Sequence, residues 1–190
     1  MGENTIVVTA VDLVGNTTQQ VLKVTRTTGP AVGIAAEDVT VAAGETVDVA
    51  AAVVDEVGNA LEGYTITGES EVGTFADGKF TAGTKAGEGK LVLKAGENGE
   101  FTKEVKVTVV PAQLAAVKAA NPFAPGKAVK LIGVDAYGNV IDGVTFAEAV
   151  DSPDAYIEGD RLIVTKEGSY EISGTKDDVT VTSTVSAYGD

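Results

Sequence analysis

The chain contains no cysteine, no histidine and no tryptophan, and its single methionine is the first residue. Without cysteine the chain has no disulfide, thiolate metal site or thiol nucleophile, and without histidine it lacks the commonest general base of enzymes. Aromatic residues make up only 5% of the sequence, against 44% hydrophobic residues in all. The core must therefore be built from valine, alanine, leucine and isoleucine, and this β-branched bias favours strands over helices.

Basic residues are also scarce, with 14 lysines and arginines against 28 aspartates and glutamates and a net charge of −14. An acidic surface repels phosphate backbones and anionic lipid, so neither nucleic acid nor a membrane surface is an expected partner. No run approaches the roughly 20 apolar residues that span a bilayer, so we expect no membrane insertion. The first residues lack a basic segment followed by an apolar core, which predicts no signal peptide. Because the chain starts inside a strand pattern, we expect it to be a piece of a longer protein.

One turn motif occurs three times. The segment Asp55-Glu56-Val57-Gly58-Asn59 follows a valine-rich run, and Asp135-Ala136-Tyr137-Gly138-Asn139 and Asp12-Leu13-Val14-Gly15-Asn16 repeat its pattern. Aspartate at the first position can accept bonds from backbone N–H groups ahead of it, and glycine at the fourth can take a positive φ. The predicted structural residues of the two longer copies are Asp55, Gly58, Asn59, Asp135, Gly138 and Asn139. A repeated turn predicts a repeated domain.

The strand pattern divides the chain into three parts. Residues 1–30 are predicted to be the C-terminal hairpin of a preceding module plus a linker, and residues 31–110 and 111–190 are predicted to be two complete domains. We expect residues 46–54 to form one buried strand and Asp77-Gly78 to be a two-residue hairpin turn. Residues 112–120 are rich in helix formers, but their place in the repeat predicts an extended segment. The fold class predicted is all-β: tandem immunoglobulin-like antiparallel β-sandwiches preceded by a partial terminal hairpin.

The turn, the Phe80-Thr81-Ala82-Gly83 element and the following Gly87-Glu88-Gly89 resemble the bacterial immunoglobulin-like repeats of cell-surface proteins. Residues 1–26 resemble the last two strands of such a module. The third part is a weaker match, because it retains only the spacing. Family members occur in surface-layer proteins, in adhesins and beside glycoside-cleaving domains. The resemblance implies a fold and an extracellular location at the bacterial cell surface or cell wall, and it carries no active site.

Two patterns invite an enzymatic interpretation. Residues 83–90 look like a phosphate-binding loop, but their glycines miss the required spacing and Leu91 stands where serine or threonine is needed. The carboxylate pairs Glu69/Glu71, Asp151/Asp154 and Asp177/Asp178 could act as acid and base on a sugar. Neighbouring carboxylates are expected by chance in so acidic a chain, and nothing in the sequence places a pair across a cleft. We therefore predict a loop, solvated surface residues and no enzyme.

Calcium is the sharper alternative for the repeated turn. Asp12, Asp55 and Asp135 recur at strand ends, and Ca²⁺ prefers carboxylate and carbonyl oxygens. Each turn supplies one carboxylate, however, and capping of the turn accounts for every copied position, so no cofactor is required. Tyr137 lies within the second turn, where a packing or inter-domain contact is favoured over a sugar platform.

The function predicted is that of a non-catalytic structural spacer in an exported bacterial surface protein, with a surface-layer lattice as one setting. Expected partners are other domains of the same protein, neighbouring copies in a surface assembly, or cell-wall glycan. Two alternatives stay open: an adhesive or carbohydrate-binding module, which an exposed patch joining Tyr137 to Tyr156 would favour, and an accessory domain of a surface glycosidase.

Overall fold

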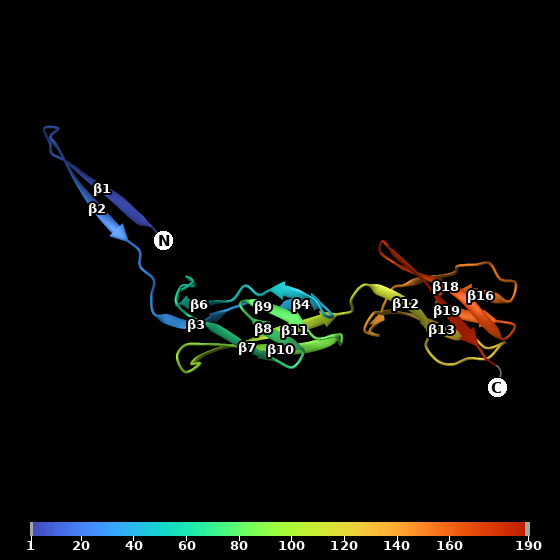
Figure 1. Ribbon diagram of the computed structural model, residues 1–190. Coiled ribbons are helices and arrows are strands. Elements are labelled where there is room, and N and C mark those ends of the chain that lie inside the picture. The colour runs from blue at the N-terminus through green and yellow to red at the C-terminus, as the bar shows by residue number, and fades with distance from the viewer. Residues whose placement is uncertain (1, 189–190) are drawn as a thin grey trace.

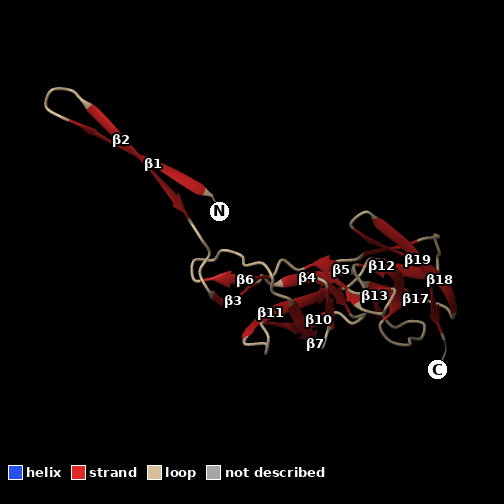
Figure 2. Ribbon diagram, turned by 60° about the vertical axis from the view of Figure 1, so that its left-hand side comes forward, coloured by secondary structure: helices blue, strands red, loops and turns tan. Residues whose placement is uncertain are grey.

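The computed structural model describes residues 2–188, and all regular elements in this range are β-strands. A two-stranded hairpin comes first, and two β-sandwiches follow it in a row (Figure 1). From a second direction the hairpin again stands clear of the first sandwich, joined to it by a linker (Figure 2). In residues 2–188 no helix has the length and apolar character needed to cross a membrane. The predicted all-β, immunoglobulin-like fold is confirmed.

The N-terminal hairpin consists of β1 (Glu3–Val11) and β2 (Thr17–Thr25). The two strands pair in one unbroken antiparallel register, in which Ile6 lies opposite Leu22. Their residues are exposed along the whole length of both strands. A strand pair alone is marginal in water, so this hairpin lacks the packing partner that its valines and leucines indicate.

The first sandwich has two layers. One layer has the order β4-β11-β10-β7, and the other contains the pair β3-β6 and the three strands β5-β9-β8. The bounds are β3 (Ala31–Ala35), β4 (Val39–Ala42), β5 (Thr46–Asp48), β6 (Ala52–Asp55), β7 (Ile66–Ser70), β8 (Gly73–Ala76), β9 (Lys79–Ala82), β10 (Gly87–Ala95) and β11 (Phe101–Val110). The chain crosses between the layers after Ala35, so β4 enters the second layer parallel to β11. The other pairs of this sandwich are antiparallel.

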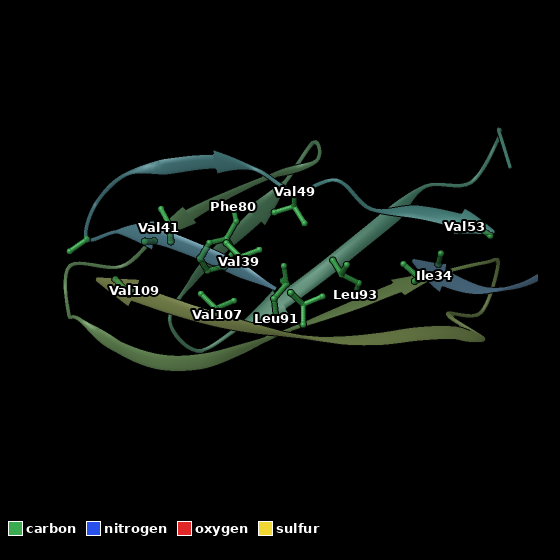
Figure 3. Close-up of a cluster of buried hydrophobic side chains, with 14 residues drawn as sticks. Ile34, Val39, Val41, Val49, Val53, Phe80, Leu91, Leu93, Val107 and Val109 are labelled. Carbon is green, nitrogen blue, oxygen red and sulfur yellow. The ribbon is translucent and has the colours of Figure 1, made fainter. Parts of the chain in front are cut away.

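The core of the first sandwich lies between these layers (Figure 3). Leu91 and Leu93 point inward from β10, Val105 and Val107 point inward from β11, and Phe80 closes the core from β9. Inward residues alternate with exposed ones along β11, which is the period-two pattern of a half-buried strand. Asp77 and Gly78 both have positive φ between β8 and β9, so the predicted two-residue hairpin turn is present.

The second sandwich repeats this plan with fewer strands. One layer has the order β12-β13-β17-β16, with β14 added on β13, and the other has the order β15-β18-β19. The bounds are β12 (Leu114–Ala119), β13 (Val129–Asp135), β14 (Val140–Ile141), β15 (Thr145–Glu148), β16 (Ala155–Glu158), β17 (Arg161–Val164), β18 (Gly168–Lys176) and β19 (Val179–Ala187). Its core includes Leu131, Leu162, Ile172 and Val185, and no residue of it belongs to the first core.

The expectation of a single strand over residues 46–54 is wrong. Thr46–Asp48 pairs with β9, whereas Ala52–Asp55 pairs with β3. Between them Val49 donates its N–H to the carbonyl of Gly78, at 2.8 Å, and keeps its side chain buried. The second copy, where β13 is unbroken, is two residues shorter here: nine positions separate Gly126 from Asp135, and eleven separate Gly44 from Asp55. The bend accommodates the additional two residues.

The segment rich in helix formers is extended, as its place in the repeat predicts. Leu114 and Val117 of β12 are buried, and the Val117 N–H donates to Ser183 Oγ at 2.9 Å. Pairing with β13 and packing against β19 satisfy this segment better than a short helix would. Tertiary context therefore overrides its helix propensity.

Candidate functional site

The three copies of the turn have the same backbone geometry. In each, the aspartate N–H donates to the asparagine carbonyl four residues later, at 3.0 to 3.1 Å, and the glycine N–H donates back to the aspartate carbonyl at 3.0 to 3.1 Å. The glycines have φ values of 89°, 83° and 89° at Gly15, Gly58 and Gly138. A side chain at this position would be strained, so glycine is required by the backbone.

The aspartate carboxylate holds each turn together from within. In the second copy, Asp55 Oδ1 accepts bonds from the N–H groups of Val57 and Asn59, at 3.1 and 2.8 Å, and Oδ2 accepts one from Asn59 Nδ2 at 2.8 Å. Asp12 and Asp135 make the same set with their own neighbours. The structure thus places Asp55, Gly58 and Asn59, and likewise Asp135, Gly138 and Asn139, in direct contact within their turns.

Two of the three carboxylates also hold a linker. Asp55 Oδ2 accepts the N–H of Gly29 at 3.0 Å, and Asp135 Oδ2 accepts the N–H of Ala112 at 2.8 Å. Both side chains are almost fully buried, with 2% and 3% of their surface exposed, whereas Asp12 is exposed. The same carboxylate therefore fixes the turn and the strand that enters its sandwich.

These donors lower the pKa of all three carboxyls. The Asn59 side chain, followed by the Gly29 N–H, lowers the pKa of Asp55 to about 2. The Asn16 side chain has the same effect on the pKa of Asp12. Burial acts to raise the pKa of Asp135, but the bonds from Asn139, Ala112 and Tyr137 outweigh it, so the pKa is lowered overall. All three groups are held as carboxylates by N–H donors.

The donors occupy the oxygens that a calcium ion would need. Both oxygens of Asp55 and of Asp135 already accept two N–H groups each. Over residues 2–188 no cluster of three or more acidic side chains is placed to share an ion. The arrangement fits a hydrogen-bonded cap better than a metal site, because Ca²⁺ takes six to eight oxygen ligands.

The second turn also reaches the sandwich before it. Asn139 Nδ2 donates to the carbonyl of Thr84 at 2.8 Å, and Asn139 Oδ1 accepts the N–H of Ala86 at 2.8 Å. Both partners lie in the loop between β9 and β10 of the first sandwich. Asn139 is therefore bonded on three sides: to its own aspartate, to a carbonyl and to an N–H of the neighbouring unit.

Tyr137 lies against the first sandwich at Gly44. Its phenol ring is so close that a Cβ built on Gly44 would come within 2.9 Å of Cζ. Gly44 has a φ of 77° in the turn between β4 and β5. The inter-domain contact favoured for Tyr137 is thus present, and this contact uses part of the side chain that a sugar platform would have needed.

We call this contact the joint: Tyr137 and Asn139 of the second sandwich against Gly44, Thr84 and Ala86 of the first. The sequence singled out Asn139 only as a turn residue, and it gave no sign of Gly44, Thr84, Ala86 or Ala112. The partners of Asn139 are backbone groups, which any residue type supplies, so no sequence motif marks them. Only the tyrosine that replaces Val57 in the second copy signals that the two turns have different neighbours.

The other candidate residues occupy ordinary surface positions. Glu69 pairs with Lys94 at 3.3 Å, and Asp154 pairs with Lys166 at 2.9 Å. The bonds from Lys166 and Thr165 lower the pKa of Asp154, opposite to the rise that a general acid requires. Asp177 has a positive φ in the turn between β18 and β19. In the segment 83–90, residues from Gly87 onward belong to β10, so the predicted loop is shorter, and a strand follows where a phosphate loop needs a helix.

No model of a known protein family matches the chain, and no curated protein matches it. Among solved structures the chain is similar to InvD of Yersinia pseudotuberculosis, with 22% identity over 81% of this chain and 57% of that chain and a TM-score of 0.43. It is similar to FdeC, an adhesin of Escherichia coli, with 20% identity, coverage of 85% and 66%, and a TM-score of 0.46. It is also similar to domains 4–9 of the surface layer protein SbsC, with 19% identity, coverage of 91% and 33%, and a TM-score of 0.32.

The chain thus spans 57% of the InvD chain and 66% of the FdeC chain. An adhesin and a surface layer protein are the kinds of protein whose repeats the sequence motifs resemble. At TM-scores below 0.5 these similarities assign no role to this chain, so its fold is described from its own strand pairing.

Proposed function

We propose that the chain is a non-catalytic spacer of an exported bacterial surface protein, in which immunoglobulin-like domains at residues 31–110 and 111–190 are held in a fixed relative position. The observation that carries this proposal is the joint. A flexible tether would need only the linker, whereas here Asn139 makes two bonds to the preceding sandwich and Tyr137 packs on its turn. A fixed joint keeps a further domain, or a neighbouring copy, at a set distance.

Charge and chemistry support the same role. A net charge of −14 keeps an elongated surface protein soluble and separate from anionic polymers. The carboxyls with lowered pKa values are held by N–H or lysine partners, and none of them is poised to donate a proton. We place the protein outside the cell, at the surface or in the cell wall. Its partners there are its own further domains or neighbouring copies, in a surface-layer lattice or a comparable assembly.

The decisive experiment measures the relative orientation of the two sandwiches by residual dipolar couplings. We expect both sandwiches of the unmodified chain to share one alignment tensor, and Asn139→Ala to give two different tensors. Two neutral hydrogen bonds contribute about 1–3 kcal/mol together, enough to shift a closed joint toward open by one to two orders of magnitude. Two independent tensors in the unmodified chain would contradict the spacer role.

The matched control is Asn59→Ala. It removes the same asparagine from the same turn in the first sandwich, including the bond to Asp55, but it touches no residue of the joint. We expect it to leave the shared tensor unchanged. A loss of shared alignment in this variant would mean that turn stability, and not the contact of Asn139, controls the orientation.

We further propose that the repeated aspartates act as turn caps and bind no calcium. Chelation with EDTA should leave the melting temperature unchanged, because N–H donors already hold the carboxylates. A rise in melting temperature on adding Ca²⁺, lost in Asp135→Asn, would show that the turns bind metal.

The adhesive alternative requires binding that the spacer role does not. The patch that would favour it joins Tyr137 to Tyr156, and Tyr137 is in contact with Gly44. We therefore favour the spacer, and a glycan array probed with the whole chain tests the alternative directly. Tight glycan binding that Tyr156→Ala abolishes would reverse this preference. Hydrolysis of a glycan by the chain would contradict the non-catalytic role.

A further inference from the structure

The first turn of the tandem, at residues 55–59, is only half engaged. Like Asp135, Asp55 holds the linker that enters its sandwich. Unlike Asn139, Asn59 has no partner beyond its own turn: within residues 2–188 no hydrogen bond reaches Asn59 Oδ1. Val57 stands where Tyr137 stands and is 68% exposed. The linker half of the joint is thus repeated here, and the half that faces a preceding sandwich is open.

The hairpin β1–β2 has the same register as β10–β11, the last hairpin of the first sandwich. Ile6 lies opposite Leu22, as Leu91 lies opposite Val105. Leu22 and Val105 each precede by seven residues the N–H that the turn carboxylate accepts, at Gly29 and Ala112. The match therefore holds both across the hairpin and along the chain.

The matching residues differ only in whether something covers them. Leu91 and Val105 have 0% and 1% of their surface exposed, whereas Ile6 and Leu22 have 50% and 44% exposed. Val8, Ala10 and Val24 continue the same face of the hairpin, because side chains alternate along a strand. In the first sandwich this face packs on the strands of its own domain, so the register also indicates what covers β1–β2.

We propose that the Val57–Asn59 end of the first sandwich is a docking surface for a complete immunoglobulin-like domain that precedes it in the same polypeptide, of which β1 and β2 are the last two strands. This proposal rests on the spacer function, and it names the partner. The partner offers Asn59 what the first sandwich offers Asn139: a carbonyl and an N–H two residues apart, in the loop before its penultimate strand. By register that loop directly precedes Gly2, since Gly2-Glu3 corresponds to Gly87-Glu88.

The test completes the hairpin with the chain's own strands. Residues 31–86 are placed before Gly2 in place of Met1, so that copies of β3 to β9 precede the full remaining chain. We expect the amides of β1 and β2 to exchange with solvent as slowly as those of β10 and β11, whereas in the unextended chain they exchange fast. We also expect all three sandwiches to share one alignment tensor in residual dipolar couplings.

Two variants test the docking surface itself. Asn59→Ala in the extended chain should free the added sandwich and leave the other two aligned. Val57→Tyr should reproduce the tyrosine contact on the copied glycine turn and make the added joint exchange more slowly. Shared alignment that survives Asn59→Ala unchanged would overturn the docking role of this turn.

One position does not match, and it is controlled separately. Arg26 stands where the register places Val109, which is buried, so the extended chain is also made with Arg26→Val. Hairpin amides that exchange fast in both extended chains would overturn the proposal. Slow exchange in the unextended chain together with a dimer in sedimentation would overturn it too, by showing that a second copy covers the hairpin. If the original two sandwiches lose their shared alignment, the spacer function fails; if only the added joint is loose, this inference alone fails.

Discussion

At the scale of single residues, one side chain serves two purposes. The carboxylate of an Asp-x-x-Gly-Asn turn closes the turn with three N–H groups, and a fourth N–H from the linker adds a fixed entry angle for the next strand. Asp12 makes the first three bonds in an exposed hairpin loop. The local geometry is therefore independent of the surrounding fold, and the linker bond distinguishes the two turns that begin a sandwich.

The lowered pKa of Asp55 predicts a stability that depends on pH. Its folded-state pKa is about 2, below the ordinary value of 3.8, so folding favours the ionised form. The resulting contribution is present above about pH 4 and is lost as the pH falls toward 2. We expect Asp55→Asn to flatten the fall in the free energy of unfolding over this range, measured by urea titration at successive pH values. Glu56→Gln, an exposed neighbour, is the control, and an equal flattening there would refute the assignment to Asp55.

Gly44 allows the strain of a turn to be separated from the contact at the joint. Gly44 and Gly126 take equivalent turn positions in the two sandwiches, with φ values of 77° and 79°. Alanine at either should cost about 1–2 kcal/mol in urea unfolding, because the left-handed region is unfavourable to a Cβ. Only Gly44→Ala meets the Tyr137 ring, whereas a Cβ on Gly126 finds nothing within 4 Å.

We therefore expect Gly44→Ala to change the relative orientation of the sandwiches in residual dipolar couplings, and Gly126→Ala to leave it unchanged. An identical response of the two variants would mean that the tyrosine contact does not contribute to the joint.

At the scale of strands and turns, local chemistry carried the sequence prediction a long way. The hairpin turns at Asp77-Gly78 and Asp12–Asn16, and the position of the long strands, follow from residues that act within their own neighbourhood. The break between β5 and β6 could not be predicted, because it depends on which sheet each half pairs with. The joint escaped for a related reason: Thr84 and Ala86 contribute backbone groups, and their meeting with Asn139 depends on the placement of two whole sandwiches.

The two copies of the plan also show what a sandwich can lose. The second has no counterpart of β4 between Ala119 and Val129, and there the Phe123 carbonyl accepts a single N–H from Tyr188, at 3.1 Å. Phe123 itself is buried in the core. One side chain anchored in the core and one hydrogen bond thus take the place of a short edge strand.

At the scale of the whole molecule, the two buried clusters are separate in sequence and in space, and the sandwiches meet at the joint and the linker bond. A row of such units gains length with each domain and keeps a set direction at each joint. Because the contact between units is small compared with either core, loss of one unit does not expose the core of the next. This is the construction expected of a spacer that holds another module away from a surface.

The separate cores predict separate unfolding. Leu91 and Leu162 are both fully buried, one in each cluster, and replacing either with alanine should cost about 2–5 kcal/mol from lost contacts and the cavity left behind. With urea titration followed by residue-resolved amide signals, Leu91→Ala should lower the midpoint of β10 and β11 and leave β18 and β19 nearly unchanged. Leu162→Ala should do the reverse. The joint can transmit only the few hydrogen bonds it contains, so equal shifts of both sets of signals in either variant would mean that the two sandwiches form one cooperative core, and the domain division at residues 110 and 111 would be wrong.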